Sequence, residues 1–420
     1  MDHLMARLSL YLPPFAGDYA GACSTLFGLD CLIVIVDAGC CTRNYVEYDE
    51  TRWARRRKSA FSAQLRTLDA VLGDDSRIIA ETLEVARELH PAAIALVGTP
   101  VPAIVGMDLA GMAYEIEQVS GVPSLGLATS GFETYEQGAS LALEALCRRF
   151  AVGERSADSL RGGREAACER PVVNVLGMTP HDFASEANME AVERCLEKAG
   201  LEIGFSTARS FSLDDVERAG WADASIVVAW SGVAAAQLLQ DRCGVPYLAA
   251  CPFGDDDCQA IAREVRGEHF RPLWAVIGDG ANGPSAAEGE SASCNPPVLL
   301  VGDQVVMNSL RPHVRARLSW AGIERPVVVG TFFSSERTWA ESGDMSFDDE
   351  CALMAFAESH PGLAVVADPL FTQIPALRDA VFLELPHEAV SGPLFAERLL
   401  RYTESETIEA LDVFVKRLGR

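Results

Sequence analysis

The chain has 420 residues and an ordinary globular composition, with 49% hydrophobic and 23% charged residues. Its 35 lysines and arginines stand against 60 aspartates and glutamates, which gives a net charge of −25. This balance argues against nucleic acid and anionic membrane surfaces as partners, because binding phosphate requires a basic surface. At about 150 residues per domain, the length corresponds to roughly three domains.

The apolar stretches and the number of cysteines indicate in which cellular compartment the protein works. The longest apolar stretch near the start, residues 32–36, has the length of a strand and is far below the roughly 18 residues of a membrane span. The opening sequence lacks the charged, apolar and small-residue order of a secretory signal. Twelve cysteines in a chain of this length do not indicate a disulfide scaffold. We therefore expect a cytoplasmic protein whose cysteines are buried as small apolar residues or bind metal.

Two polar stretches divide the chain. Residues 153–170 and 278–297 are rich in small and charged residues and lack apolar periodicity, so they read as linkers. They leave a first domain over 1–152, a second over 171–277 and a third over 298–420, which ends in a helix.

Each of the three parts alternates apolar strands with amphipathic helices. The first part predicts strands over 31–37, 92–99 and 122–129, and helices over 76–90 and 109–121. The second predicts strands over 172–178, 201–207, 224–230 and 245–251, and helices over 186–199 and 233–243. The third predicts strands over 296–303, 326–332, 363–369 and 381–386, and a helix over 304–321. This pattern predicts an α/β fold of three tandem Rossmann-like domains, each with a parallel sheet covered on both faces.

A pair of cysteines follows the first strand. Residues 37–43 read DAGCCTR, which places Cys40 and Cys41 at a strand-to-helix turn. The helix dipole at such a turn lowers the pKa of a thiol and favours metal ligation, and ligands in parallel sheets lie beyond the carboxyl ends of the strands. No CxxC pair and no ferredoxin-type cysteine run occurs, so local sequence does not supply a complete iron–sulfur site. The alternative is that most of the cysteines are buried apolar residues.

Other catalytic motifs are missing from the sequence. It contains no GxxxxGK[ST] loop, no GxGxxG after a first strand, no GxSxG elbow and no HExxH. Among seven histidines, only His387, in the sequence LELPHEAVSGP after the last predicted strand, is a candidate for function. The alternative for His387 is an ordinary loop histidine.

Several segments, in order along nearly the whole chain, resemble one known family. They are PPFAGDYAGAC, LIVIVDAGCCTR, VNVLGMTPHDF, LLQDRCGVPYLAACPFG and FLELPHEAVSGP. Together they are similar to the nitrogenase component 1 superfamily, which includes the dark-operative protochlorophyllide and chlorophyllide reductases and the nickel-sirohydrochlorin reductive cyclase. The resemblance implies a subunit that receives electrons from a separate ATP-dependent iron protein through an iron–sulfur cluster at a subunit interface.

The resemblance also assigns positions. Cys40 matches the second cluster cysteine of the family, whereas the first falls at about Gly17 or Asp18 and the third at Pro100. The cysteine that anchors the molybdenum cofactor falls near 228–229, where the chain has no cysteine, so no molybdenum cofactor is expected. The cofactor histidine falls near position 386, one residue before His387.

These departures leave two hypotheses. In the first, Cys40 binds a 4Fe–4S cluster shared with a second component 1 subunit, identical or different, because such a cluster usually takes four ligands. Cys41, Cys23 and Asp18 are the candidate helpers within the chain, and we expect the side chains of the adjacent Cys40 and Cys41 to diverge. In the second, the chain is a non-catalytic scaffold or an assembly partner for a metallocofactor or tetrapyrrole. A periplasmic-type binding protein is a third interpretation, disfavoured by the missing signal segment.

Overall fold

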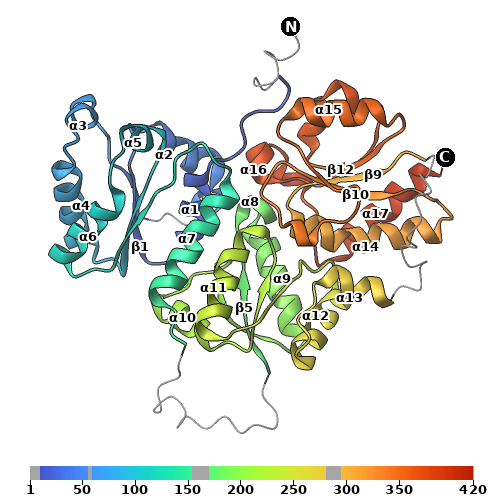
Figure 1. Cartoon of the computed structure of the whole chain (residues 1–420), viewed down its shortest axis with the longest axis horizontal. Coiled ribbons are helices and arrows are strands. Elements are labelled where there is room, and N and C mark those ends of the chain that lie inside the picture. The colour runs from blue at the N-terminus through green and yellow to red at the C-terminus, as the bar shows by residue number, and fades with distance from the viewer. Residues whose placement is uncertain (1–9, 55–58, 154–169, 281–294, 420) are drawn as a thin grey trace.

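The computed structural model describes residues 10–54, 59–153, 170–280 and 295–419 (Figure 1). They form three β-sheets that follow one another along the chain, and every strand pair is parallel. The predicted α/β fold with three tandem Rossmann-like sheets is confirmed.

The first sheet has the order β2-β1-β3-β4. Its strands are β1 (Cys31–Ile35), β2 (Ala60–Ser62), β3 (Ala93–Val97) and β4 (Ser124–Leu127). Its helices are α1 (Asp18–Leu26), α2 (Cys40–Asn44), α3 (Thr67–Leu72), α4 (Ser76–Leu89), α5 (Pro100–Val105), α6 (Leu109–Ser120) and α7 (Tyr135–Phe150). Strands β1 and β3 are buried along their whole length, because helices cover both faces of the sheet.

The second sheet has the order β6-β5-β7-β8. Its strands are β5 (Val172–Leu176), β6 (Glu202–Ser206), β7 (Ala224–Val227) and β8 (Tyr247–Ala249). Its helices are α8 (Pro180–Phe183), α9 (Glu186–Lys198), α10 (Leu213–Arg218), α11 (Val233–Cys243), α12 (Asp255–Gly267) and α13 (Leu273–Gly280).

The third sheet has the order β11-β10-β9-β12-β13. Its strands are β9 (Val298–Val301), β10 (Val327–Thr331), β11 (Met345–Ser346), β12 (Ala364–Ala367) and β13 (Val381–Glu384). Its helices are α14 (Gln304–Trp320), α15 (Glu350–Ser359), α16 (Glu388–Ser391) and α17 (Ser405–Leu418). A π-helical turn covers Tyr45–Asp49, and short 3₁₀ turns cover Thr51–Ala54, Ala219–Trp221, Trp230–Gly232, Arg337–Trp339, Pro369–Gln373, Pro375–Leu377 and Gly392–Arg398.

Helix α7 joins the first sheet to the second. Figure 1 shows α4 and α6 on the outer side of the first sheet, and α7 on its inner side, next to the second sheet. Helices α1 and α7 approach closely because glycines face each other's backbone: a Cβ on Gly21 would lie 1.9 Å from the carbonyl oxygen of Tyr135. One cluster of buried apolar side chains extends across all three sheets and contains Ile33, Val227 and Val365.

The two predicted linkers lie mostly outside the described residues. Helix α13 continues to Gly280, three residues into the second predicted linker, and β9 begins at Val298. Over the described residues, we find no helix with both the length and the apolar character needed to cross a membrane.

One disulfide connects two helices of the second sheet. Cys195 of α9 and Cys258 of α12 are bonded, with Cα atoms 6.1 Å apart and 63 residues between them in sequence. The expectation that the cysteines are only buried apolar residues or metal ligands is therefore wrong for this pair. The fold brings the two residues together from segments that no local motif connects.

Candidate functional site

The cysteine pair lies at the carboxyl end of β1, as predicted. Gly39 precedes α2 with a φ of 107°, a left-handed conformation that glycine adopts without strain. This turn places Cys40 on the surface and leaves Cys41 half-buried. The side chain of Cys40 is therefore open to a second molecule.

A buried carboxylate fixes this turn. Asp37 accepts hydrogen bonds from the backbone N–H of Thr42 at 2.8 Å, from the hydroxyl of Thr42 at 2.9 Å and from the hydroxyl of Ser62 at 2.6 Å. Two of these donors belong to α2 and the third to β2, so Asp37 holds the start of the helix against the edge of the sheet.

Asp37, Cys40 and Cys41 form a group that could hold a metal ion. Their ligand atoms all lie within 4.8 Å of one another, and the two sulfur atoms are 4.0 Å apart. The expectation that the two cysteine side chains diverge is wrong. Successive side chains of a helix are separated by about 100° rather than the 180° of a strand, so the sulfurs of neighbours can converge.

The sulfur spacing fits metal ligation. Two thiolates on one tetrahedral ion with metal–sulfur bonds of about 2.3 Å lie about 3.8 Å apart, close to the distance observed here. This spacing fits two ligands of a single metal ion, whereas a 4Fe–4S cluster takes one thiolate on each of its four irons. The exposed Cys40 therefore supplies one ligand of such a cluster, and the other ligands must come from elsewhere.

Burial also affects the Cys41 thiol. Burial, followed by the nearby Cys40, raises the pKa of Cys41 to about 12. The Cys41 thiol therefore stays protonated at neutral pH until a cation displaces its proton.

Cys23 and Asp18 lie outside this group of ligand atoms. Cys23 is fully buried within α1, and burial raises the pKa of its thiol well above the ordinary value. Asp18 accepts hydrogen bonds from the backbone N–H groups of Ser130 at 2.7 Å and Gly131 at 2.6 Å, and from its neighbour Tyr19 at 2.7 Å. Its carboxylate thus anchors the turn before α7.

His387 lies in a second site, where the three sheets meet. Its Nε2 is 3.2 Å from the hydroxyl oxygen of Tyr135 in α7 and 3.6 Å from the carboxylate of Asp182 in α8. The Tyr135 hydroxyl donates a hydrogen bond to Asp182. The backbone N–H of His387 donates to Asp368 at 2.7 Å, which fixes the loop after β13. A tyrosine, a carboxylate and an imidazole thus come from three distant segments.

A narrow pocket opens beside this network. We call it the junction pocket; its polar lining residues are Asp182, Asp303, His387 and Tyr402. Its volume of about 10 Å³ corresponds to one water molecule. A substrate of tetrapyrrole size therefore requires the surrounding elements to move apart.

Two groups at this junction have strongly shifted pKa values. Burial, followed by the charge of Asp182, raises the pKa of Asp303 to about 7. One Asp303 oxygen caps α14 and the other accepts from the backbone N–H of Trp230 at 2.9 Å. Burial lowers the pKa of His181, whose ring stacks on Tyr135 with centroids 5.0 Å apart, to about 4.

Sequence reasoning missed Tyr135, His181, Asp182 and Asp303. Asp182 and Asp303 each follow the carboxyl end of a strand, β5 and β9 respectively, so the rule that ligands lie beyond these ends could have found them. Tyr135 opens a helix that was not predicted, and no sequence signal connects it with the other residues.

The chain is similar to several known proteins. The family model described as nitrogenase component 1 type oxidoreductase matches residues 18–273. The chain is 24% identical over 202 residues to the nitrogenase iron-molybdenum cofactor biosynthesis protein NifE of Clostridium pasteurianum, covering 48% of this chain and 41% of that protein. It is 28% identical over 198 residues to one subunit of the light-independent protochlorophyllide reductase of Bradyrhizobium sp. (strain ORS 278), covering 46% of this chain and 38% of that protein. The alignments thus span less than half the length of these relatives.

A solved structure shares the fold over the whole chain. The structure described as nitrogenase Cp1 at pH 6.5 superposes with a TM-score of 0.66 at 13% sequence identity, covering 98% of this chain and 94% of that one. The family model alone spans more than half of the chain and includes its first two sheets. The chain therefore belongs to the nitrogenase component 1 type oxidoreductase family, as its sequence motifs predict.

Proposed function

We propose that this chain is a cytoplasmic subunit of a nitrogenase-like oxidoreductase, which accepts electrons from a separate ATP-dependent iron protein. The electrons enter through an iron–sulfur cluster bound by Cys40 at the interface with a second component 1 subunit. The observation that carries this proposal is the exposed thiol of Cys40 at the carboxyl end of β1, with the half-buried Cys41 beside it. One exposed thiol is an incomplete ligand set for a cluster, so another polypeptide would have to complete it.

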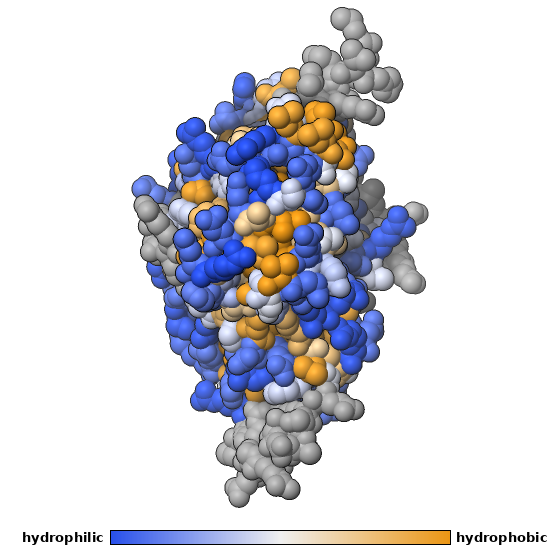
Figure 2. Space-filling model, turned by 90° about the vertical axis from the view of Figure 1, so that its left-hand side faces the viewer, coloured by the Kyte–Doolittle hydropathy of each residue, from blue (hydrophilic) through white to orange (hydrophobic). Residues whose placement is uncertain are grey.

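Apolar surface beside the thiol pair supports an interface. We call it the α3–α5 patch: Leu68, Val71, Leu72, Val101, Ile104 and Val105, each between 39% and 75% exposed. Helix α5 begins directly after Thr99, a neighbour of Cys41, and α3 follows Gln64, which lies beside Gly39. Figure 2, which views the side of the molecule where the first sheet lies, shows apolar patches set in a mostly hydrophilic surface. Such patches on a soluble protein are typical of interaction sites.

The junction pocket is the proposed position of the reduced substrate. A cluster at Cys40 would supply single low-potential electrons when bound. Reduction also consumes protons, and Asp303, with a pKa of about 7, can hold one here. The hydrogen-bonded Tyr135, Asp182 and His387 lie beside it. In this proposal, side chains of this chain orient the bound substrate and donate protons to it.

The test uses the assembled complex. The chain is purified anaerobically alone and together with its candidate second subunit, and iron, acid-labile sulfide and ATP-dependent reduction with the iron protein are measured. Iron and sulfide in the complex, with little in the isolated chain, support the proposal. A complex that forms without iron and transfers no electrons contradicts it.

A second candidate function is a scaffold for metallocofactor or tetrapyrrole assembly. It is favoured by the similarity to NifE, which is described as a cofactor biosynthesis protein, and by Pro100 at a position where the family has a cluster cysteine. Under this alternative, the complex takes up a cofactor precursor and passes it on without catalysing ATP-dependent reduction. The same preparation therefore separates the two functions.

A further inference from the structure

The disulfide joins the two helices that position Tyr402, a lining residue of the junction pocket. Asn188 of α9 accepts a hydrogen bond from the backbone N–H of Tyr402 at 3.0 Å. Phe253, just before α12, packs its ring 5.1 Å from the ring of Tyr402. Tyr402 in turn donates its hydroxyl to the carbonyl oxygen of Asp182 at 3.1 Å. Fixing α9 to α12 therefore fixes one wall of the pocket.

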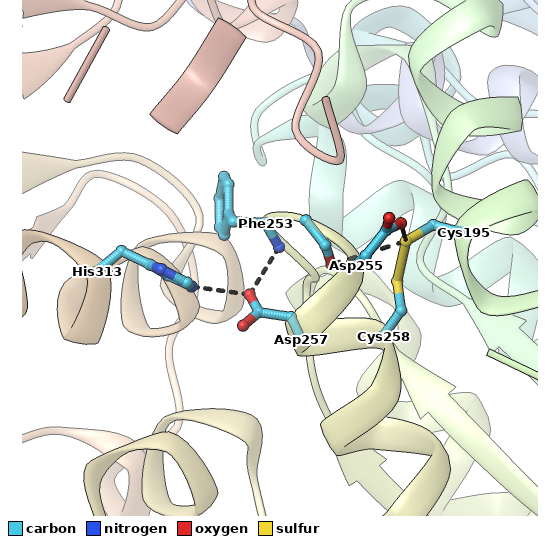
Figure 3. Close-up of a disulfide and its surroundings, with 7 residues drawn as sticks. Cys195, Phe253, Asp255, Asp257, Cys258 and His313 are labelled. Atoms are coloured by element: carbon cyan, nitrogen blue, oxygen red, sulfur yellow. Dashed lines mark hydrogen bonds and ion pairs between the residues drawn. A yellow bond between two sulfur atoms is a disulfide. The ribbon is translucent and has the colours of Figure 1, made fainter. Parts of the chain in front are cut away.

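The residue before Cys258 extends this link to the third sheet. Asp257 accepts a hydrogen bond from the backbone N–H of Phe253 at 2.8 Å, and its same oxygen lies 2.8 Å from Nε2 of His313 in α14 (Figure 3). Helix α14 begins at the junction pocket, where Asp303 caps it. The first turn of α12 thus contacts Phe253, which packs against Tyr402, and His313, which lies in the helix that begins at the pocket.

The two sulfurs are buried under an exposed turn. Cys195 and Cys258 are 3% and 1% exposed. Cys195 Sγ lies 3.4 Å from the carboxylate of Asp255 and 3.7 Å from the carbonyl oxygen of Gly254 (Figure 3). Gly254 has a φ of 115° with open space around it, and Asp255 is exposed. Opening this one turn gives a small thiol access to the sulfurs, and local openings of this kind require less free energy than global unfolding.

We propose that Cys195 and Cys258 form a reversible dithiol–disulfide pair that controls the packing of Tyr402 and thereby the opening of the junction pocket. Oxidation proceeds by exchange with a small disulfide such as glutathione disulfide: its sulfur–sulfur bond breaks and the Cys195–Cys258 bond forms. Two electrons and two thiol protons pass from the protein to the two thiols released. A small thiol or dithiol reverses the reaction. The regulatory role of the cysteine pair rests on the function proposed for the pocket, whereas the thiol–disulfide exchange reaction does not depend on that function.

The experiment follows the full-length protein in glutathione buffers of increasing oxidation. Free thiols are trapped with iodoacetamide and mapped by mass spectrometry, and hydrogen exchange is measured for the segment around Tyr402 and for the start of α14. We expect Cys195 and Cys258 to become protected from alkylation together. We also expect amide exchange at Tyr402 to slow about tenfold or more in the oxidised form, because the opening that permits exchange is restrained.

Matched variants identify the pair. In Cys258→Ala the redox dependence of exchange at Tyr402 should disappear, whereas Cys243→Ala, which removes a free thiol in α11, should retain it. The proposal is overturned if the pair ignores the buffer, or if Tyr402 exchanges equally fast in both redox forms. Because no cluster or iron protein takes part, this result is independent of iron binding, and the wild-type measurement remains decisive if a variant fails to fold.

Discussion

Two buried aspartates near the amino end show why the thiols, rather than carboxylates, are the stronger ligand candidates. Asp18 accepts hydrogen bonds from three backbone N–H groups, and Asp37 accepts from one backbone N–H and two hydroxyls. A metal ion that bound these oxygens would displace donors that hold α1 and α2 in place. Cys40, in contrast, is exposed and holds no element together.

His181 makes a prediction about pH. Burial depresses its pKa from 6.5 to about 4 in the folded state, so the unfolded chain binds a proton that the native chain does not. The contribution to stability is complete above pH 6.5 and is lost as the pH falls toward 4. At pH 5 the native state should have lost about 2 kcal/mol from this residue alone. In His181→Phe, which keeps the ring against Tyr135, that part of the loss should vanish.

Urea unfolding of both proteins at pH 7.5 and pH 5 checks this result. His90→Asn, at the exposed end of α4, is the control and should behave like the wild type. Equal pH dependence in the wild type and in His181→Phe would show that this imidazole is not desolvated in the native state.

Among the elements, the sequence predicted those that appear as a continuous apolar run or as a helical period. The apolar runs that form β1, β5 and β9 stand out because both faces of each strand are covered. Helix α1 was not predicted, because all nine of its residues are buried and it has no polar face to reveal a helical period. The disulfide between α9 and α12 depends on the packing of segments 63 residues apart, which periodicity does not report.

The α3–α5 patch makes a prediction at this scale. The combined change Leu72→Glu and Ile104→Glu places charges on residues that are 72% and 73% exposed in the chain alone, so folding stability should change by no more than about 0.5 kcal/mol. Binding of the second subunit should weaken at least about tenfold, because the charges would be desolvated in the complex. Sedimentation velocity on the anaerobic complex measures this loss. Val119→Glu, on the exposed face of α6, should leave binding unchanged; equal weakening by both variants would rule out the patch as the interface.

At the scale of the whole molecule, the junction joins what the sequence presents as separate units. Tyr135 lies in α7, Asp182 in α8 and His387 in the loop after β13, so their contacts connect segments that accompany three different sheets. From the sequence, His387 was the one member of this network singled out. The other members come together only in the three-dimensional fold. Asp182 and Asp303 follow strand ends, but the sequence does not show that they meet.

Tyr135→Phe tests this connection. Removing the hydroxyl leaves a buried oxygen of Asp182 without its donor, which should cost about 1–3 kcal/mol of global stability. Because the contact joins three sheets, probes in all of them should shift together in denaturant unfolding. Tyr114→Phe, an exposed tyrosine of α6, is the matched control and should be neutral. A shift confined to one sheet would show that the junction does not couple them.

Iron analysis of the assembled complex shows whether Cys40 binds a cluster that another subunit completes. Wild-type, Cys40→Ala and Cys243→Ala chains are each purified anaerobically in complex with the second subunit, and iron and acid-labile sulfide are quantified per complex. We expect Cys40→Ala to lose both iron and sulfide, and Cys243→Ala, which lacks a half-buried thiol of α11, to keep both. Full iron and sulfide in an intact Cys40→Ala complex would contradict it.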